Sequence, residues 1–139
     1  MTMEEKLDLS MQISELQLNL VDLLMEVNRF KTKYENNLQF NNCIENIENN
    51  KVFSNFKQDY DLLKIKFEDF KLKKNENNKL DLYKCMLEEF DFIRDDLTLI
   101  KSFNNNLLDE QTYLFCYCKL VFATKNIELM YDIISQMNV

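Results

Sequence analysis

The sequence predicts an all-α protein, an antiparallel bundle of four or five helices with a long N-terminal helix. The chain has 139 residues and contains neither glycine nor proline. Tight β-hairpin turns favour glycine, and asparagine is the main substitute available here, so an all-β fold is disfavoured. Apolar residues also recur every three or four positions along most of the chain, which indicates helices. We expect residues 1–139 to form a single domain, because this length suits one hydrophobic core.

The longest periodic stretch predicts a helix over residues 9–34. Its apolar residues follow one another at alternating gaps of four and three, which is a heptad seam: Leu9, Ile13, Leu16, Leu20, Leu23, Val27, Phe30 and Tyr34. A second apolar row lies at helical spacing on the opposite side: Leu7, Met11, Leu18, Val21 and Met25. A helix that is apolar on two faces needs two sets of neighbours. The second row therefore lies either inside the bundle or against a partner chain, and it is the candidate interface.

Three further segments continue the bundle. Residues 38–50 predict a short helix, and an aromatic seam from Phe53 to Phe70 predicts a longer one. The polar segment 71–79 predicts a hairpin, in which asparagine adopts the left-handed conformation that ends a helix. The next helix is expected over residues 80–103, and its inward side chains are expected to be Tyr83, Leu87, Phe90, Ile93, Leu97, Ile100 and Phe103. We expect the first helix and the aromatic helix to supply the core, with a dimer seam as a further role.

The last helix is predicted to be central. Asn106 is the expected N-cap, because its side-chain oxygen can accept from a backbone amide of the first turn. Asp109 and Glu110 suit the positive end of the helix dipole. The segment 113–123 has a single charge, Lys119, so it should be buried nearly all round. A break over residues 124–126 is expected before a final set of turns.

The composition excludes several classes of enzyme and points to a non-enzymatic protein. Without glycine there is no phosphate-binding glycine loop and no dinucleotide-binding fingerprint. The chain also lacks histidine, so the common histidine-assisted nucleophiles and histidine zinc sites are absent. We therefore expect no catalytic residue and no cofactor.

Charge and cysteine content bear on partners and location. The chain carries 17 basic and 24 acidic residues, a net charge of −7, which disfavours direct binding to nucleic acid or to anionic membranes. The first ten residues include Glu4, Glu5 and Asp8, unlike the basic start of a secretory signal. A cytoplasmic protein is expected, whose four cysteines stay reduced.

Two clusters of side chains are candidate sites. Cys116 and Cys118 lie two apart and would point in different directions on a helix, while Cys43 and Cys85 stand alone. We expect buried thiols and no metal site. The acidic cluster is Glu88, Glu89, Asp91, Asp95 and Asp96. Its members are expected to lie largely outward. Glu88, Asp91 and Asp95 share one helical face and form a candidate acidic surface, which is either functional or simply solvated.

Two segments resemble the YlbF/YmcA family of small helical regulators. Residues 46–63 (NIENNKVFSNFKQDYDLL) resemble a helical segment of that family, and Leu99–Asn104 (LIKSFN) resembles its L-V-x-E-Y-N motif. Leu107, Tyr113, Leu114, Tyr117, Leu120, Val121 and Phe122 follow at its apolar spacing. The chain departs from the family pattern at Thr98, where proline is usual. The resemblance implies an adaptor that forms homo- or hetero-oligomers, modulates an RNA-degrading endonuclease and has no catalytic residue.

Two alternatives remain beside an interaction or regulatory adaptor. One is a virus- or phage-borne acidic inhibitor that binds a nucleic-acid-binding protein of its host, which needs a contiguous acidic face. The other is a structural coiled-coil subunit, whose second apolar row would be exposed in the monomer and covered in the assembly. The partner in every case is a protein, in a homo- or hetero-oligomer.

Overall fold

A computed structural model of the chain describes residues 2–36, 44–73, 76–103 and 108–137. Within these ranges there are four α-helices and one 3-10 helix: α1 (Met3–Glu35), η1 (Ile44–Asn49), α3 (Lys51–Leu72), α4 (Glu76–Ser102) and α5 (Glu110–Ser135). The described ranges contain no strand. The prediction of an all-α bundle with a long N-terminal helix is therefore confirmed.

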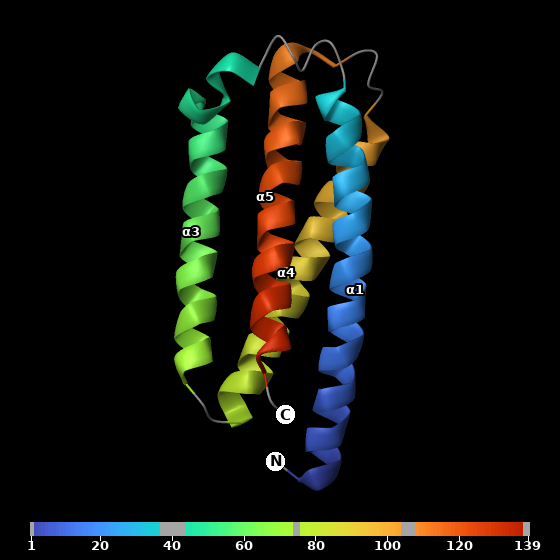
Figure 1. Cartoon of the computed structure of the whole chain (residues 1–139), viewed down its shortest axis with the longest axis vertical. Coiled ribbons are helices and arrows are strands. Elements are labelled where there is room, and N and C mark those ends of the chain that lie inside the picture. Colours follow the sequence, from blue (N-terminus) through green and yellow to red (C-terminus); the bar gives the residue numbers. More distant parts are fainter. Residues whose placement is uncertain (1, 37–43, 74–75, 104–107, 138–139) are drawn as a thin grey trace.

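Figure 1 shows how the helices alternate in direction. α1 and α4 run one way and α3 and α5 run the other, so helices that follow one another in the chain are antiparallel. α5 lies between α3 and α1, and it packs against both. α4 crosses behind α5 on a diagonal, from the end of α3 towards the end of α1. α3 and α5 are neighbours that run parallel. Because α5 contacts each of the three other α-helices, it lies at the centre of the bundle.

The ends of α1 and α5 are fixed by side-chain caps. The backbone N–H of Glu5 donates to Thr2 Oγ1 (3.1 Å), and the N–H of Thr2 donates to Glu5 Oε2 (3.0 Å), a complete capping box. At the start of α5, Asp109 accepts from the N–H of Thr112 (2.7 Å), and this bond lowers the pKa of Asp109. The observed N-cap is thus Asp109 rather than the predicted Asn106, which lies outside the described residues.

The inner seam of α1 is buried as predicted. Of the eight predicted residues, Phe30 is half-buried. The other seven are buried: Leu9, Ile13, Leu16, Leu20, Leu23, Val27 and Tyr34. The ring of Tyr34 meets that of Tyr113 on α5 edge-on, with centroids 5.4 Å apart. This edge-to-face contact joins the last turns of α1 to the first turns of α5.

α5 is buried on nearly all sides and has no break. It runs without interruption from Glu110 to Ser135, so the predicted break over residues 124–126 is wrong. Thr124 lies in mid-helix, and its hydroxyl is satisfied there because Oγ1 donates to the carbonyl of Leu120 (2.9 Å). Asn126 is held by Glu89 of α4, whose Oε1 accepts from its Nδ2 (3.3 Å). Both polar side chains are accommodated without ending the helix.

α3 contributes one buried residue to the core and otherwise covers α5, so the aromatic helix supplies less of the core than expected. Phe67 is the one fully buried residue of α3. Phe53, Phe56 and Tyr60 are half-buried around Phe122 of α5, with ring centroids 5.1, 6.2 and 6.3 Å away. Because α3 packs chiefly on one neighbour, α5, these three rings are only half-buried.

α4 also buries a different set of residues from the one expected. Tyr83, Leu87 and Phe90 are only half-buried, whereas Leu82 and Met86 are fully buried. The predicted Ile93, Leu97 and Ile100 are buried as expected. The diagonal crossing explains the change, because a helix that crosses its neighbours at an angle turns a different face to them along its length.

The first described residue after α3, at the start of the turn to α4, is a lysine and not an asparagine. α3 ends at Leu72, and its C-cap Lys73 is extended (φ −87°, ψ 103°). Asn77 and Asn78 have no positive φ, and Asn75 lies outside the described residues. The predicted turn itself is present, because α3 and α4 are antiparallel neighbours.

The two faces of α1 predict very different costs for the same substitution. Leu20 is 0% exposed and Leu18 is 69% exposed. Leu20→Ala should lower the free energy of unfolding by about 2–5 kcal/mol, because it leaves a cavity. Leu18→Ala should change it by less than about 0.5 kcal/mol in the isolated chain. Urea unfolding of both variants measures the difference, and equal losses would contradict the assignment of the two faces.

Candidate interaction surface

The second apolar row of α1 lies on the outer face of the bundle. The exposed fractions of its side chains are large for all but Val21: Leu7 62%, Met11 63%, Leu18 69%, Val21 37% and Met25 61%. The other half of the same helix is buried against α5 and α4. The structure therefore brings all five candidate interface residues together on one exposed face.

Ser14 completes this row into a heptad seam. Positions 7, 11, 14, 18, 21 and 25 follow one another at alternating gaps of four and three. We call Leu7, Met11, Ser14, Leu18, Val21 and Met25 the outer seam. At 1.5 Å per residue it is about 27 Å long. Ser14 is polar and does not belong to the apolar row, but its spacing places it in the seam.

The three residues of the candidate acidic surface on α4 are exposed, whereas Glu89 and Asp96 of the wider acidic cluster are half-buried. Glu88, Asp91 and Asp95 are exposed, and Asp91 pairs with Arg94 (3.1 Å). Asp96, which was expected to face outward, pairs with Lys119 of α5 (2.8 Å). The acidic residues of α4 are thus divided between an exposed face and the contact with α5.

Glu89 was also expected to face outward, and it instead lies half-buried towards α5. Burial raises the pKa of its carboxyl, and the hydrogen bond from Asn126 acts in the opposite direction. This carboxylate is one polar contact that holds α4 against the centre of α5. Its role in the described structure is to join two helices.

The three described cysteines are free thiols. Cys116 and Cys118 are fully buried and Cys85 is half-buried, while Cys43 lies outside the described residues. Burial raises the pKa of both buried thiols, that of Cys118 to about 11. Within the described ranges no three histidine, cysteine or acidic residues are placed to hold a metal ion. The prediction that Cys116 and Cys118 are buried thiols is confirmed.

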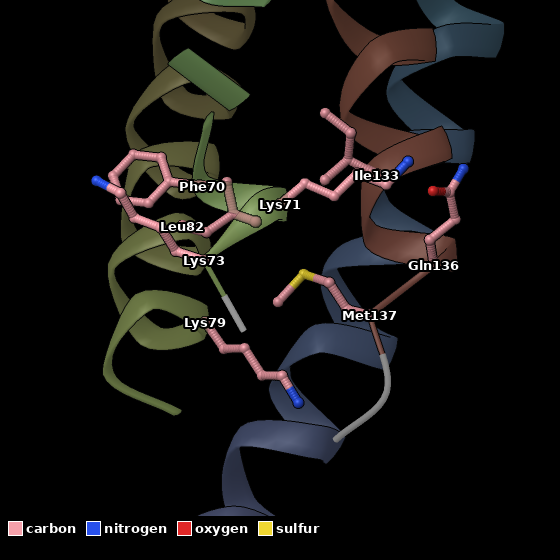
Figure 2. A pocket seen from close by; sticks show the side chains of 8 residues that line it. All are labelled: Phe70, Lys71, Lys73, Lys79, Leu82, Ile133, Gln136 and Met137. Carbon is pink, nitrogen blue, oxygen red and sulfur yellow. The ribbon is translucent and has the colours of Figure 1, made fainter. Parts of the chain in front are cut away.

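A pocket of about 350 Å³ opens at the end of the bundle where α3 and α5 finish and α4 begins. Figure 2 shows Lys71 extending from α3 towards α5, with Met137 beside the opening. Lys73 pairs with Asp69 (3.2 Å), and Leu82 and Ile133 give the pocket an apolar floor. The described lining residues include no carboxylate and no thiol. Its described polar lining consists of three lysines, Lys71, Lys73 and Lys79, and Gln136.

Comparisons with known proteins give no relative for this chain. No family model, no curated protein and no solved structure matches it. Among the helices of the described ranges, none has the length and apolar character needed to cross a bilayer.

The burial of the thiols predicts the order in which they react. In a Cys43→Ser background, Cys85 should react with iodoacetamide before Cys116 and Cys118, because alkylation requires an accessible thiolate. Mass spectrometry of the folded protein at pH 8 measures the order. Denatured protein is the control, in which all three thiols should react at similar rates. Early modification of Cys118 in the folded protein would contradict its burial.

The raised pKa values also predict that the fold weakens in alkali. Burial raises the pKa of Cys118, Tyr34 and Tyr117, so above pH 9 the unfolded chain releases protons that the folded chain retains. The free energy of unfolding must then fall as pH rises. Between pH 8 and 10.5 the free energy of unfolding should fall in both proteins. The fall should be smaller in Cys118→Ala than in the unaltered protein, by on the order of 1 kcal/mol. Equal losses would show that the Cys118 thiol is not responsible.

Proposed function

We propose that this chain is a non-enzymatic interaction or regulatory protein that binds another protein through the outer seam of α1. One observation carries the proposal. Five large apolar side chains lie exposed in a single row on a helix whose opposite face builds the core. Monomeric proteins expose scattered apolar residues, whereas a contiguous row marks a contact surface.

The heptad spacing of the outer seam supports a helical partner. Residues that repeat in this way on an exposed face insert between the side chains of a second helix. Covering them removes apolar surface from water, which contributes about 25 cal/mol per Å². The core does not need the outer seam, because the buried residues of α1, α4 and α5 already pack into one cluster.

Other exposed apolar residues support a contact surface less well. Leu62 and Phe92 are exposed and line one shallow opening between α3 and α4. Charged residues line the same opening: Asp59, Lys66, Glu89 and Asp96. Ile65 and Leu72 are also exposed and follow Leu62 at helical spacing on α3, but this row is shorter than the outer seam. The outer seam is therefore the surface on which the proposal rests.

An adaptor of this kind agrees with what the YlbF/YmcA resemblance implies, and we place it in the cytoplasm. A structural coiled-coil subunit would use the same exposed row, and it differs from an adaptor in whether the partner is permanent. The acidic inhibitor needs a contiguous acidic face. The α4 cluster supports it less, because Asp96 and Glu89 turn towards α5 and Asp91 pairs with Arg94.

Site-specific crosslinking tests the proposal directly. A photoreactive amino acid replaces Leu18, and the protein is expressed in the cells from which the chain comes. We expect a discrete crosslinked protein from position 18, because a partner helix on the outer seam would lie within reach. The matched control carries the same amino acid at Lys57, an exposed position on α3. Equal crosslinking from both positions, or none from position 18, would rule out the proposal.

A charged variant separates binding from folding. Leu18→Glu combined with Met25→Glu should dissociate any complex formed through the outer seam and leave the helix content unchanged. Both side chains are more than half exposed, at 69% and 61%, so the bundle does not need them. Light scattering after size exclusion and circular dichroism measure the two effects. A loss of helicity would assign the row to the core and count against the proposed function.

A further inference from the structure

The two edges of the outer seam differ in charge. Asp8, Glu15 and Asp22 repeat at intervals of seven along one edge, and all three are exposed. In a heptad these positions directly flank the apolar seam and face the flanking positions of a partner helix. Arg29 continues the same spacing, and it lies beyond Met25, the last apolar residue of the seam. The edge is therefore acidic over the whole length of the outer seam.

The opposite edge carries no charge along the seam. It consists of Ser10, Gln17 and Leu24. Gln17 Nε2 donates to Ser135 Oγ of α5 (2.8 Å), so this side chain is held towards the bundle. Leu24 is half-buried and packs against the core. The charge that a partner helix meets therefore comes from the acidic edge.

This arrangement disfavours a second copy of the chain as the occupant. If two copies paired antiparallel, like edges would meet, and three acidic residues would face three acidic residues. If they paired parallel, the acidic edge would meet the uncharged edge, with no opposite charge to attract it. Each copy also carries a net charge of −7, which adds long-range repulsion to either arrangement.

We infer that the outer seam binds an amphipathic helix of another protein whose positions flanking its apolar seam carry lysine or arginine. The inference rests on the proposed function, because it names the partner of the same surface. Basic side chains at those positions lie opposite Asp8, Glu15 and Asp22 and form interhelical ion pairs. The apolar seam supplies most of the affinity, and the charge pairs select the partner and its register.

Two synthetic peptides of about three heptads test this inference on the full-length protein. Both have leucine at the seam positions, and one has lysine at all flanking positions where the other has glutamate. Like charges on each peptide keep it from pairing with itself. Titration calorimetry should show the lysine peptide binding at least about tenfold more tightly. The difference should shrink when salt is raised from about 0.05 to 0.5 M.

A matched pair of variants separates the acidic edge from overall charge. Glu15→Lys with Asp22→Lys reverses the edge and should reverse the peptide preference. Asp61→Lys with Glu68→Lys makes the same change in net charge on exposed positions of α3 and should leave the preference as it was. A lysine peptide with serine at its seam positions should not bind, because the apolar contact is missing.

Several outcomes would overturn the inference. These are equal binding of the two peptides, an equal effect of the two double variants, and a homodimer that Leu18→Glu dissociates. The proposed function is judged separately, by crosslinking at position 18. A partner captured there while the lysine peptide fails would leave the interaction surface in place and refute only the basic helix. The absence of any crosslink would refute both.

Discussion

The fold depends on the need to cover α5 on nearly every side. Eleven residues of this helix are buried, and they are distributed around its circumference from Tyr113 to Ile134. A helix that is apolar all round is stable in water only when other elements surround it. α1, α3 and α4 each pack against α5. Even Lys119 fits this environment, because its ammonium lies 5.7 and 5.5 Å from the ring centroids of Phe56 and Phe115 and pairs with Asp96.

The same constraint explains why α1 has an unpartnered face. Its inner seam is fully used in covering α5 and α4, and α3 lies on the far side of α5. No described helix covers the outer seam, so its apolar residues face solvent. The function that we propose follows from this geometry: one heptad seam holds the bundle together, and the other is available to a second protein.

The sequence predicted regular periodicity well and the relative placement of helices poorly. The inner seam of α1 was predictable because a gap pattern of four and three specifies a single helical face, and Leu20 and Val27 are buried accordingly. The break near Thr124 was wrong because polar residues look like helix ends until their partners are known. Glu89 and Asp96 were misplaced for a related reason, since their partners lie on α5. The acidic edge repeats every seven residues in the sequence, but its place beside an exposed apolar seam follows only from how α1 packs.

Native-state hydrogen exchange tests most directly the claim that α5 is the centre of the fold. Amides in the middle of α5, around Leu120 and Ile127, should exchange only through global unfolding, because burial on nearly all sides hinders local opening. Amides of α3 around Tyr60 should exchange faster, since that helix packs chiefly on one neighbour and can open locally. If the amides of α3 were as protected as those of α5, or α5 exchanged first, α5 would not be the element around which the bundle is built.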